Sequence, residues 1–190
     1  MIAKGHDFPN LTVVGILGVD QMLSLPSFRA EERAYQLIVQ AAGRAGRSPK
    51  GGEVYIQAYD IKHPVIQHVI HGTYESFMQE NLAQRRRLHH PPYGAIGQVH
   101  LSSLNETLVH NSAQHIYRVW QKVTLPRDLR AEAPELMAPA PAPIAMIRNR
   151  YRYLLTIKSP NEFLITRYLK LALQIHDEPQ VRISVELDPA

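Results

Sequence analysis

Two kinds of hydrophobic pattern follow one another in the N-terminal half of the chain. Residues 11–17 are rich in β-branched side chains and residues 53–59 alternate between apolar and polar, so both segments are predicted to be strands. Between them, residues 28–45 have the apolar spacing of a helix, and helices are also predicted over 63–71 and 73–88. A strand–helix–strand order predicts two parallel strands joined by a right-handed crossover.

The C-terminal half has a different order of elements, which is typical of a split βαβ unit. The order is strand, helix, short strand, hairpin, helix and strand, and it predicts a small α+β domain of ferredoxin-like type. The predicted strands are 96–102, 135–138, 144–148, 151–158 and 180–187, the predicted helices are 106–123 and 162–175, and the hairpin turns near Asn149.

Paired prolines in His89–Gly94 mark the limit between these two halves. Proline lacks a backbone donor and disfavours helix in the residue before it. We therefore predict two domains, residues 1–92 and residues 93–190. The Pro/Ala-rich segment Ala131–Pro143 is either a flexible linker or an ordered extended segment, and we favour the ordered segment because the chain must cross between strands there.

Composition narrows the class of protein without fixing its function. The 190 residues, 45% hydrophobic and 20% charged, can form two small cores. The net charge of +4 permits nucleic-acid binding but does not require it. With no cysteine, the chain has no disulfide and no thiolate zinc site. No apolar run reaches the ~20 residues of a membrane span and there is no signal-peptide pattern, so we expect a soluble, cytoplasmic protein with no membrane contact.

The segment Gln40–Arg47, sequence QAAGRAGR, carries the strongest chemical signal. At ~100° per residue, Gln40, Arg44 and Arg47 share one face of a helix. The opposite face is apolar, and the glycines of the segment would let a phosphate approach the backbone closely. Two guanidinium groups at this spacing can bind a polyphosphate and offset the charge that develops in phosphoryl transfer. A solvated basic helix end is the alternative reading of the two arginines alone.

The full string, Q-x-x-G-R-x-G-R, resembles motif VI of superfamily 2 helicases. Ile2–Pro9 is similar to motif V in the form found in the primosomal replication-restart helicase family (primosomal protein N′, PriA). This resemblance continues through most of the chain, at His90–Gly94, Ala138–Ile144, Arg150–Tyr153 and Val181–Pro189. It implies that the first domain is the C-terminal part of a RecA-like helicase lobe (lobe 2).

Membership of that family implies an ATP-dependent 3′→5′ DNA helicase that recognises stalled replication forks and restarts replication by primosome assembly. The implied partners are forked and single-stranded DNA, the single-stranded-DNA-binding protein and other primosome proteins. The resemblance implies catalytic arginine fingers at Arg44 and Arg47, further ATP contacts at Gly5, Asp7 and Gln40, and DNA contacts at Lys4 and His6.

Several elements of such a helicase are absent from this sequence. There is no G-x-x-x-x-G-K-[ST] phosphate loop and no D-E-x-H motif for Mg²⁺, and the family's cysteine-rich zinc module has no counterpart here. We therefore expect the chain to be a C-terminal portion of the helicase, of natural or artificial origin, that is inactive as an ATPase by itself. ATP and Mg²⁺ are cofactors expected of the full-length protein, and zinc is expected only in the module that this chain lacks.

Basic residues also recur in the second domain. Arg148, Arg150 and Arg152 alternate with other residues, among them Tyr151 and Tyr153, which predicts three guanidiniums on one strand face and the tyrosines on the other. The three arginines are our candidate DNA contacts, as phosphate ligands, and a merely solvated strand face is the alternative. The basic helix end Arg85–Arg87 is a second place where DNA could bind.

Ten histidines raise the question of a metal site. His63, His68 and His71 are near helical spacing, and His89 and His90 are adjacent, but no carboxylate is placed to complete a ligand set. We predict no metal site. Three other possibilities stay open: a stand-alone DNA- or protein-binding adaptor without ATPase activity, a part of another superfamily 2 helicase of RecG-like type, and a purely structural, degenerate remnant.

Overall fold

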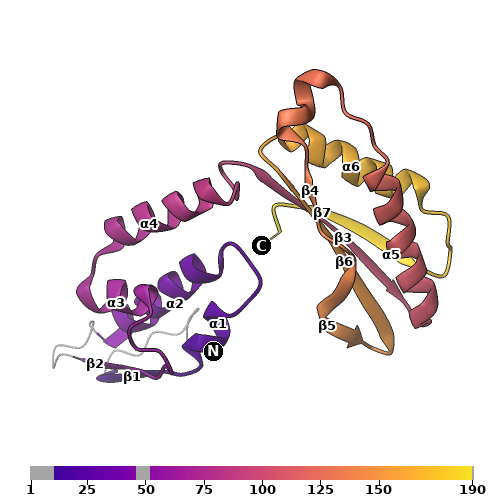
Figure 1. Ribbon diagram of the computed structural model, residues 1–190. Helices are drawn as coiled ribbons and strands as arrows, with labels where there is room; N and C mark the ends of the chain where they lie inside the picture. Colours follow the sequence, from indigo (N-terminus) through magenta and orange to yellow (C-terminus); the bar gives the residue numbers. More distant parts are fainter. Residues whose placement is uncertain (1–10, 46–51, 190) are drawn as a thin grey trace. The chain divides into compact units, whose positions relative to one another are not determined.

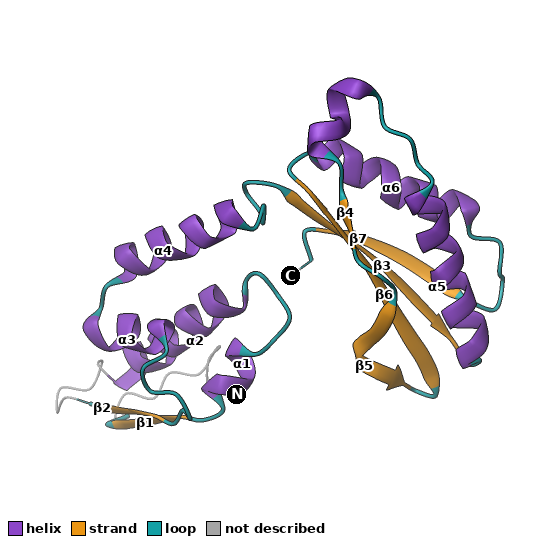
Figure 2. Ribbon diagram, in the orientation of Figure 1, coloured by secondary structure: helices purple, strands orange, loops and turns teal. Residues whose placement is uncertain are grey.

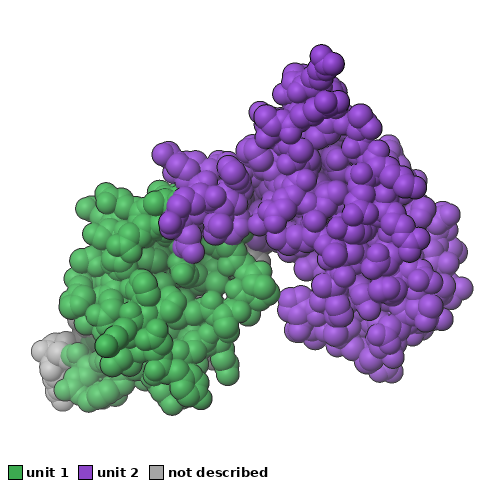
Figure 3. Space-filling model, viewed as in Figure 1, with its two compact units in different colours: residues 1–83 green, residues 84–190 purple. Residues whose placement is uncertain are grey.

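The computed structural model describes residues 11–45 and 52–189. The chain divides into two compact units, Met1–Ala83 and Gln84–Ala190 (Figure 3). The division falls within helix α4 (Tyr74–Arg87), whereas the sequence placed the domain limit between residues 92 and 93. Each unit has hydrophobic clusters of its own.

Unit 1 contains a two-stranded parallel sheet and the helices that follow its strands (Figure 1). Its elements are β1 (Val13–Ile16), α1 (Val19–Leu23), α2 (Ala30–Ala45), β2 (Glu53–Ile56), α3 (Pro64–His71) and the greater part of α4. Val13 pairs with Glu53 and Ile16 with Ile56, so the predicted parallel pairing is confirmed. The short helix α1 was not predicted, because five residues after Gly18 are too few to show a helical period.

Two apolar clusters hold the helices of unit 1 in place. Ile38 of α2 packs with Ile16, Val19 and Ile66, so α2 is buried against the β1–β2 sheet. One turn earlier on the buried side of α2, Tyr35 stacks on Phe77 of α4 with ring centroids 4.6 Å apart. The side-chain amide of Asn81 also donates to Glu31 over 3.0 Å. Helix α2 is therefore anchored both to the sheet and to α4.

Unit 2 is a layer of two helices on an antiparallel sheet (Figure 2). Its elements are β3 (Ala95–Ser103), α5 (Glu106–Gln121), the 3₁₀ helix η1 (Arg127–Glu132), β4 (Glu135–Leu136), β5 (Ala140–Ile147), β6 (Arg150–Ser159), α6 (Glu162–Ile175) and β7 (Arg182–Leu187). The strand order is β4–β6–β3–β7, with β5 also pairing with β6. The strands are thus interleaved as in the predicted split βαβ arrangement.

The helices of unit 2 begin at asparagine caps and pack on one face of the sheet. Asn105 accepts from the backbone N–H of Leu108, and Asn161 accepts from Phe163 N–H and Leu164 N–H. Alternate residues of β3 and β6 form the core with the two helices, and Trp120 of α5 donates to the backbone oxygen of Tyr168 in α6 over 3.1 Å. The side chains between these core positions point to the opposite side of the sheet, which we call the open face.

The segment before the hairpin is ordered, as predicted. Ala131–Pro143 contains the end of η1, β4 and the first half of β5, and the Ser159 hydroxyl donates to the backbone oxygen of Glu132 over 2.8 Å. The hairpin turn itself consists of Arg148 and Asn149, both with positive φ, 49° and 59°. The predicted turn near Asn149 is therefore confirmed, but the first strand begins at Ala140, earlier than residue 144, because a bulge lets it pair over a longer span.

Candidate functional site

The outer face of α2 carries the described part of the arginine motif. Ile38 and Ala45 are fully buried on one side of the helix, whereas Gln40 and Gly43 are exposed and Arg44 is half-buried. A Cβ added at Gly43 would meet no atom within 4 Å. The predicted division of α2 into an apolar and a polar side is confirmed, and the polar side has open space at its glycine.

Five of the predicted site residues lie outside the described residues. These are Lys4, Gly5, His6, Asp7 and Arg47. The structure therefore places Gln40 and Arg44 of the ATP-directed set, and their roles and those of the other members stay predictions.

The three arginines of the predicted phosphate stripe have three different environments. Arg148 is exposed in the hairpin turn, so the prediction of a single strand face was wrong for this residue, because the two-residue turn leaves no room for it in the ladder. Arg150 donates from Nη2 to the backbone oxygen of Ser102 over 2.9 Å. Arg152 donates from Nη1 to the backbone oxygen of Ile144 over 3.3 Å and is partly exposed.

The tyrosines of the same strand lie where they were predicted. Tyr151 and Tyr153 pack against the core cluster on the helix side of the sheet, and Arg150 and Arg152 occupy the alternate positions. The His110 ring meets the Tyr153 ring edge-on at a centroid distance of 5.4 Å. The two aromatic rings therefore serve packing on the helix side and are not available on the open face.

The three arginines at the end of helix α4 differ in how deeply they are buried. Arg85 is 8% exposed and donates from Nη1 to the backbone oxygen of Pro91. The Arg86 guanidinium lies 4.7 Å from the centre of the Tyr93 ring, and Arg87 is exposed. Arg85 thus holds the turn that follows α4, and the block does not present three equivalent cations.

One basic residue that the sequence did not single out lies in the same cross-strand row as Arg152. Arg182 is exposed at the start of β7, and its position pairs across the sheet with Ser102, the residue that also pairs with Arg152. The alternation of residues 181–187 indicated that Arg182 points away from the core. Its nearness to Arg152 depends on the strand order, which the sequence pattern does not reveal.

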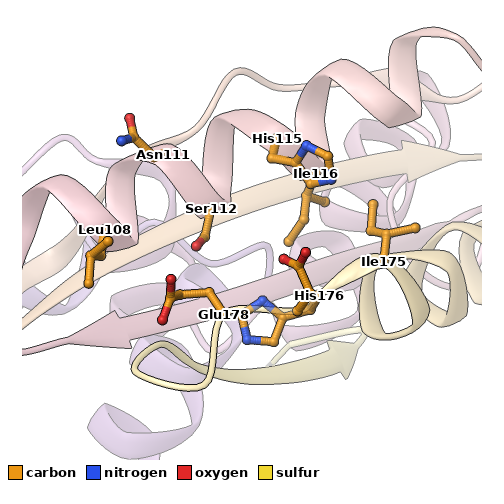
Figure 4. A pocket seen from close by; sticks show the side chains of 9 residues that line it. Leu108, Asn111, Ser112, His115, Ile116, Ile175, His176 and Glu178 are labelled. Atoms are coloured by element: carbon orange, nitrogen blue, oxygen red, sulfur yellow. The ribbon is translucent and has the colours of Figure 1, made fainter.

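A pocket of about 190 Å³ opens on the helix side of unit 2 (Figure 4). Ser112 and His115 of α5 line it together with His176, Asp177 and Glu178 after α6. His176 Nε2 lies 2.8 Å from the backbone oxygen of Val181, which fixes the ring. Two carboxylates in so small a space would repel phosphate, so this pocket does not fit a nucleic-acid backbone.

The described residues contain neither a cluster of metal ligands nor a helix suited to a membrane. No three His, Cys, Asp or Glu side chains within 11–45 and 52–189 are close enough to hold a metal ion together. Over the same ranges, no helix has the length and apolar character needed to cross a membrane.

Comparison with known proteins decides the family. Residues 86–190 match the model of the primosomal protein N C-terminal domain. The chain belongs to this family. The predicted resemblance to the PriA family is thereby confirmed, and the matched region begins at the end of α4 and covers the whole sheet of unit 2.

Three similar proteins carry the name replication restart protein PriA. The relative from Bacillus subtilis (strain 168) is 37% identical over 193 residues, covering all of this chain and 23% of the relative. The relative from Synechocystis is 35% identical over the whole chain and 22% of its own length, and that from Haemophilus influenzae is 32% identical over the whole chain and 25% of its length. The chain thus spans about a quarter of the length of these relatives.

Proposed function

We propose that this chain is part of an ATP-dependent 3′→5′ DNA helicase that acts at stalled replication forks in replication restart. Unit 1 would form part of a RecA-like lobe, and unit 2 would contribute DNA contacts. The names of the relatives support the role in replication restart. The observation that carries the enzymatic part is the polar face of α2, where Gln40, Gly43 and Arg44 lie opposite a buried apolar face.

This face fits the phosphates of a bound nucleotide. The open space at Gly43 would let a phosphate oxygen approach the helix, and Arg44 stands one position further along. A guanidinium offers paired donors and a permanent charge, which stabilise negative charge as it spreads over the transferred phosphoryl group. Mg²⁺ would shield the same phosphates in the full-length protein, held by residues outside this chain, since the sequence has no phosphate-loop motif.

Arginine fingers act on the transition state more than on binding, and this gives the test. In the full-length protein, Arg44→Ala and Arg47→Ala should each lower DNA-stimulated ATP turnover by on the order of 10³-fold, as in the GTPase cases. DNA affinity measured by fluorescence anisotropy on a forked oligonucleotide should change by less than about threefold, because the proposal assigns these residues to ATP. Lysine at either position should restore little activity, because it lacks the planar fork.

Arg33→Ala is the matched control for Arg44→Ala. Arg33 is an exposed arginine on the same helix, roughly 16 Å away along the helix axis at 1.5 Å per residue. It is expected to leave ATP turnover within about twofold of wild type, because a phosphate bound at Arg44 is out of its reach. Unchanged turnover in both the Arg44→Ala and Arg47→Ala variants would remove the finger assignment.

A further inference from the structure

The open face of the unit 2 sheet is organised as cross-strand rows. Strands β6, β3 and β7 are neighbours in that order, and their registers place one residue of each strand in line. From the hairpin end, successive rows of the open face are Arg152–Ser102–Arg182, Leu154–His100–Ser184 and Thr156–Gln98–Glu186.

Charge changes sign along these rows. The first row holds two arginines, and Arg150 extends over its centre to the backbone oxygen of Ser102. The last row holds Glu186, whose Oε2 lies 3.5 Å from His100 Nε2. Beyond it, the Lys158 ammonium group is paired with Glu135 over 3.3 Å. The acidic groups thus gather at one end of the open face, and the unneutralised positive charge lies at the other.

Three arginines occupy open-face positions near the hairpin end of the sheet. Arg152 and Arg182 stand at the two ends of the row through Ser102, and Arg150 is one open-face position nearer the turn. Among the described residues, none of Arg150, Arg152 and Arg182 forms an ion pair, and the side chain of Arg182 has no hydrogen bond. Like charges on one face of a sheet repel one another, and a bound anion would offset that repulsion. The Ser102 hydroxyl accepts from Arg150 Nε over 3.5 Å and keeps its own hydrogen free to donate.

We propose that Arg152, Ser102 and Arg182 form a binding site for the phosphodiester backbone of DNA, with Arg182 as a ligand from β7. Arg152 and Arg182 flank the central strand β3 and contact the phosphates of a DNA strand from two sides. The hydroxyl of Ser102 donates to the same phosphates from between them. Arg150 is a positioning residue, because its guanidinium holds the backbone of β3 at Ser102. This inference rests on the proposed DNA-binding function and names the surface that performs it.

The chemistry of the face points to the backbone of DNA and not to its bases. Tyr151 and Tyr153 face the helices, and the three rows of the open face contain no Phe, Tyr or Trp on which a base could stack. Phosphate contacts carry no sequence information, so binding should be insensitive to base sequence and sensitive to salt. The negative charges of Glu186 and Glu135 at the other end of the face would repel the DNA strand and so keep it at the arginine end.

The test uses the 190-residue chain and a fluorescein-labelled single-stranded oligonucleotide of mixed sequence, with anisotropy measured from 50 to 200 mM NaCl. Each lost phosphate contact should reduce the slope of log affinity against log salt by about 0.7 for a single strand. We expect Arg182→Gln and Arg152→Gln each to flatten the slope by about that amount, and the double variant by about 1.4. Arg182→Lys should keep the wild-type slope, because the charge is retained.

Arg167→Gln, an exposed arginine on α6 and so on the helix side, makes the same change of charge away from the open face and should leave the slope unchanged. Circular dichroism verifies that each variant is folded. Equal slopes in Arg182→Gln and Arg167→Gln overturn the assignment of Arg182.

If the slope instead falls in an Arg87→Gln variant, DNA binding stands but its surface is the end of α4. Failure of the wild-type chain to bind DNA at 50 mM salt overturns this site, while the ATP-directed part of the proposed function is judged separately by the Arg44 and Arg47 variants.

Discussion

The imidazole of His90, which follows helix α4, lies near cationic side chains. Burial lowers the pKa of His90 below its ordinary value of 6.5, the positive charges of Lys158 and Arg85 lower it further, and Glu135 partly opposes them. In the unfolded chain His90 regains its ordinary pKa. Between the two pKa values the unfolded state therefore binds more protons than the folded state, and stability rises with pH.

This difference predicts how the stability of unit 2 depends on pH. The contribution of neutral His90 is fully present above about pH 6.5 and is lost progressively as the pH falls from there towards the folded-state pKa. Urea unfolding between pH 5.5 and 7.5, followed by the fluorescence of Trp120, the single tryptophan, should show this slope. His90→Gln should make it shallower, whereas His115→Gln, at an exposed position of α5, should not. Identical slopes in the two variants would contradict the assignment to His90.

At the scale of elements, the contact of α6 with β3 depends on a missing side chain. A Cβ built on Gly97 would lie 2.6 Å from Ile165 Cγ2 and 2.9 Å from Ile157 Cγ2. Ile165 is fully buried in the core of unit 2, so it has little room to move. Helix α6 therefore approaches the sheet as closely as it does because β3 has glycine at this point.

Gly97→Ala should accordingly destabilise unit 2. We expect the free energy of unfolding to fall by about 1–3 kcal/mol, as for other overpacked cores, in urea unfolding followed by Trp120 fluorescence. Gln98→Ala, at the next position of the strand and on the open face, is the control and should change it by less than about 0.5 kcal/mol. If the Gly97→Ala variant is as stable as Gln98→Ala, helix α6 can shift away from the sheet without a loss of stability, and the prediction is wrong.

At the scale of the whole molecule, the chain has a candidate arginine finger but no phosphate loop. Arginines offset charge on a nucleotide that other groups hold, and they do not replace the loop and the metal. We therefore expect the purified 190-residue chain to release no phosphate from ATP above background, with or without DNA, in a phosphate-release assay. Turnover that disappears in the Arg44→Ala/Arg47→Ala double variant would contradict this, because it would arise from the chain itself.

Local pattern was sufficient to predict most elements of both units. Helix α6 has the predicted limits, Glu162–Ile175, because an asparagine cap and an uninterrupted apolar period mark both ends. The two faces of α2 also followed from helical spacing alone, as did the position of Tyr151 and Tyr153 on the core side of β6. These features depend on residues that are close in sequence, so contiguous sequence encodes them.

Tertiary structure alone decided which basic residues share a row of the sheet. The sequence grouped Arg148 with Arg150 and Arg152, but the turn separates Arg148 from the strand, and Arg150 is bound to Ser102, 48 positions earlier. Arg182 joins Arg152 only because β3 lies between β6 and β7. Strand order results from packing the whole apolar face of the sheet under two helices, a long-range condition that no local period contains.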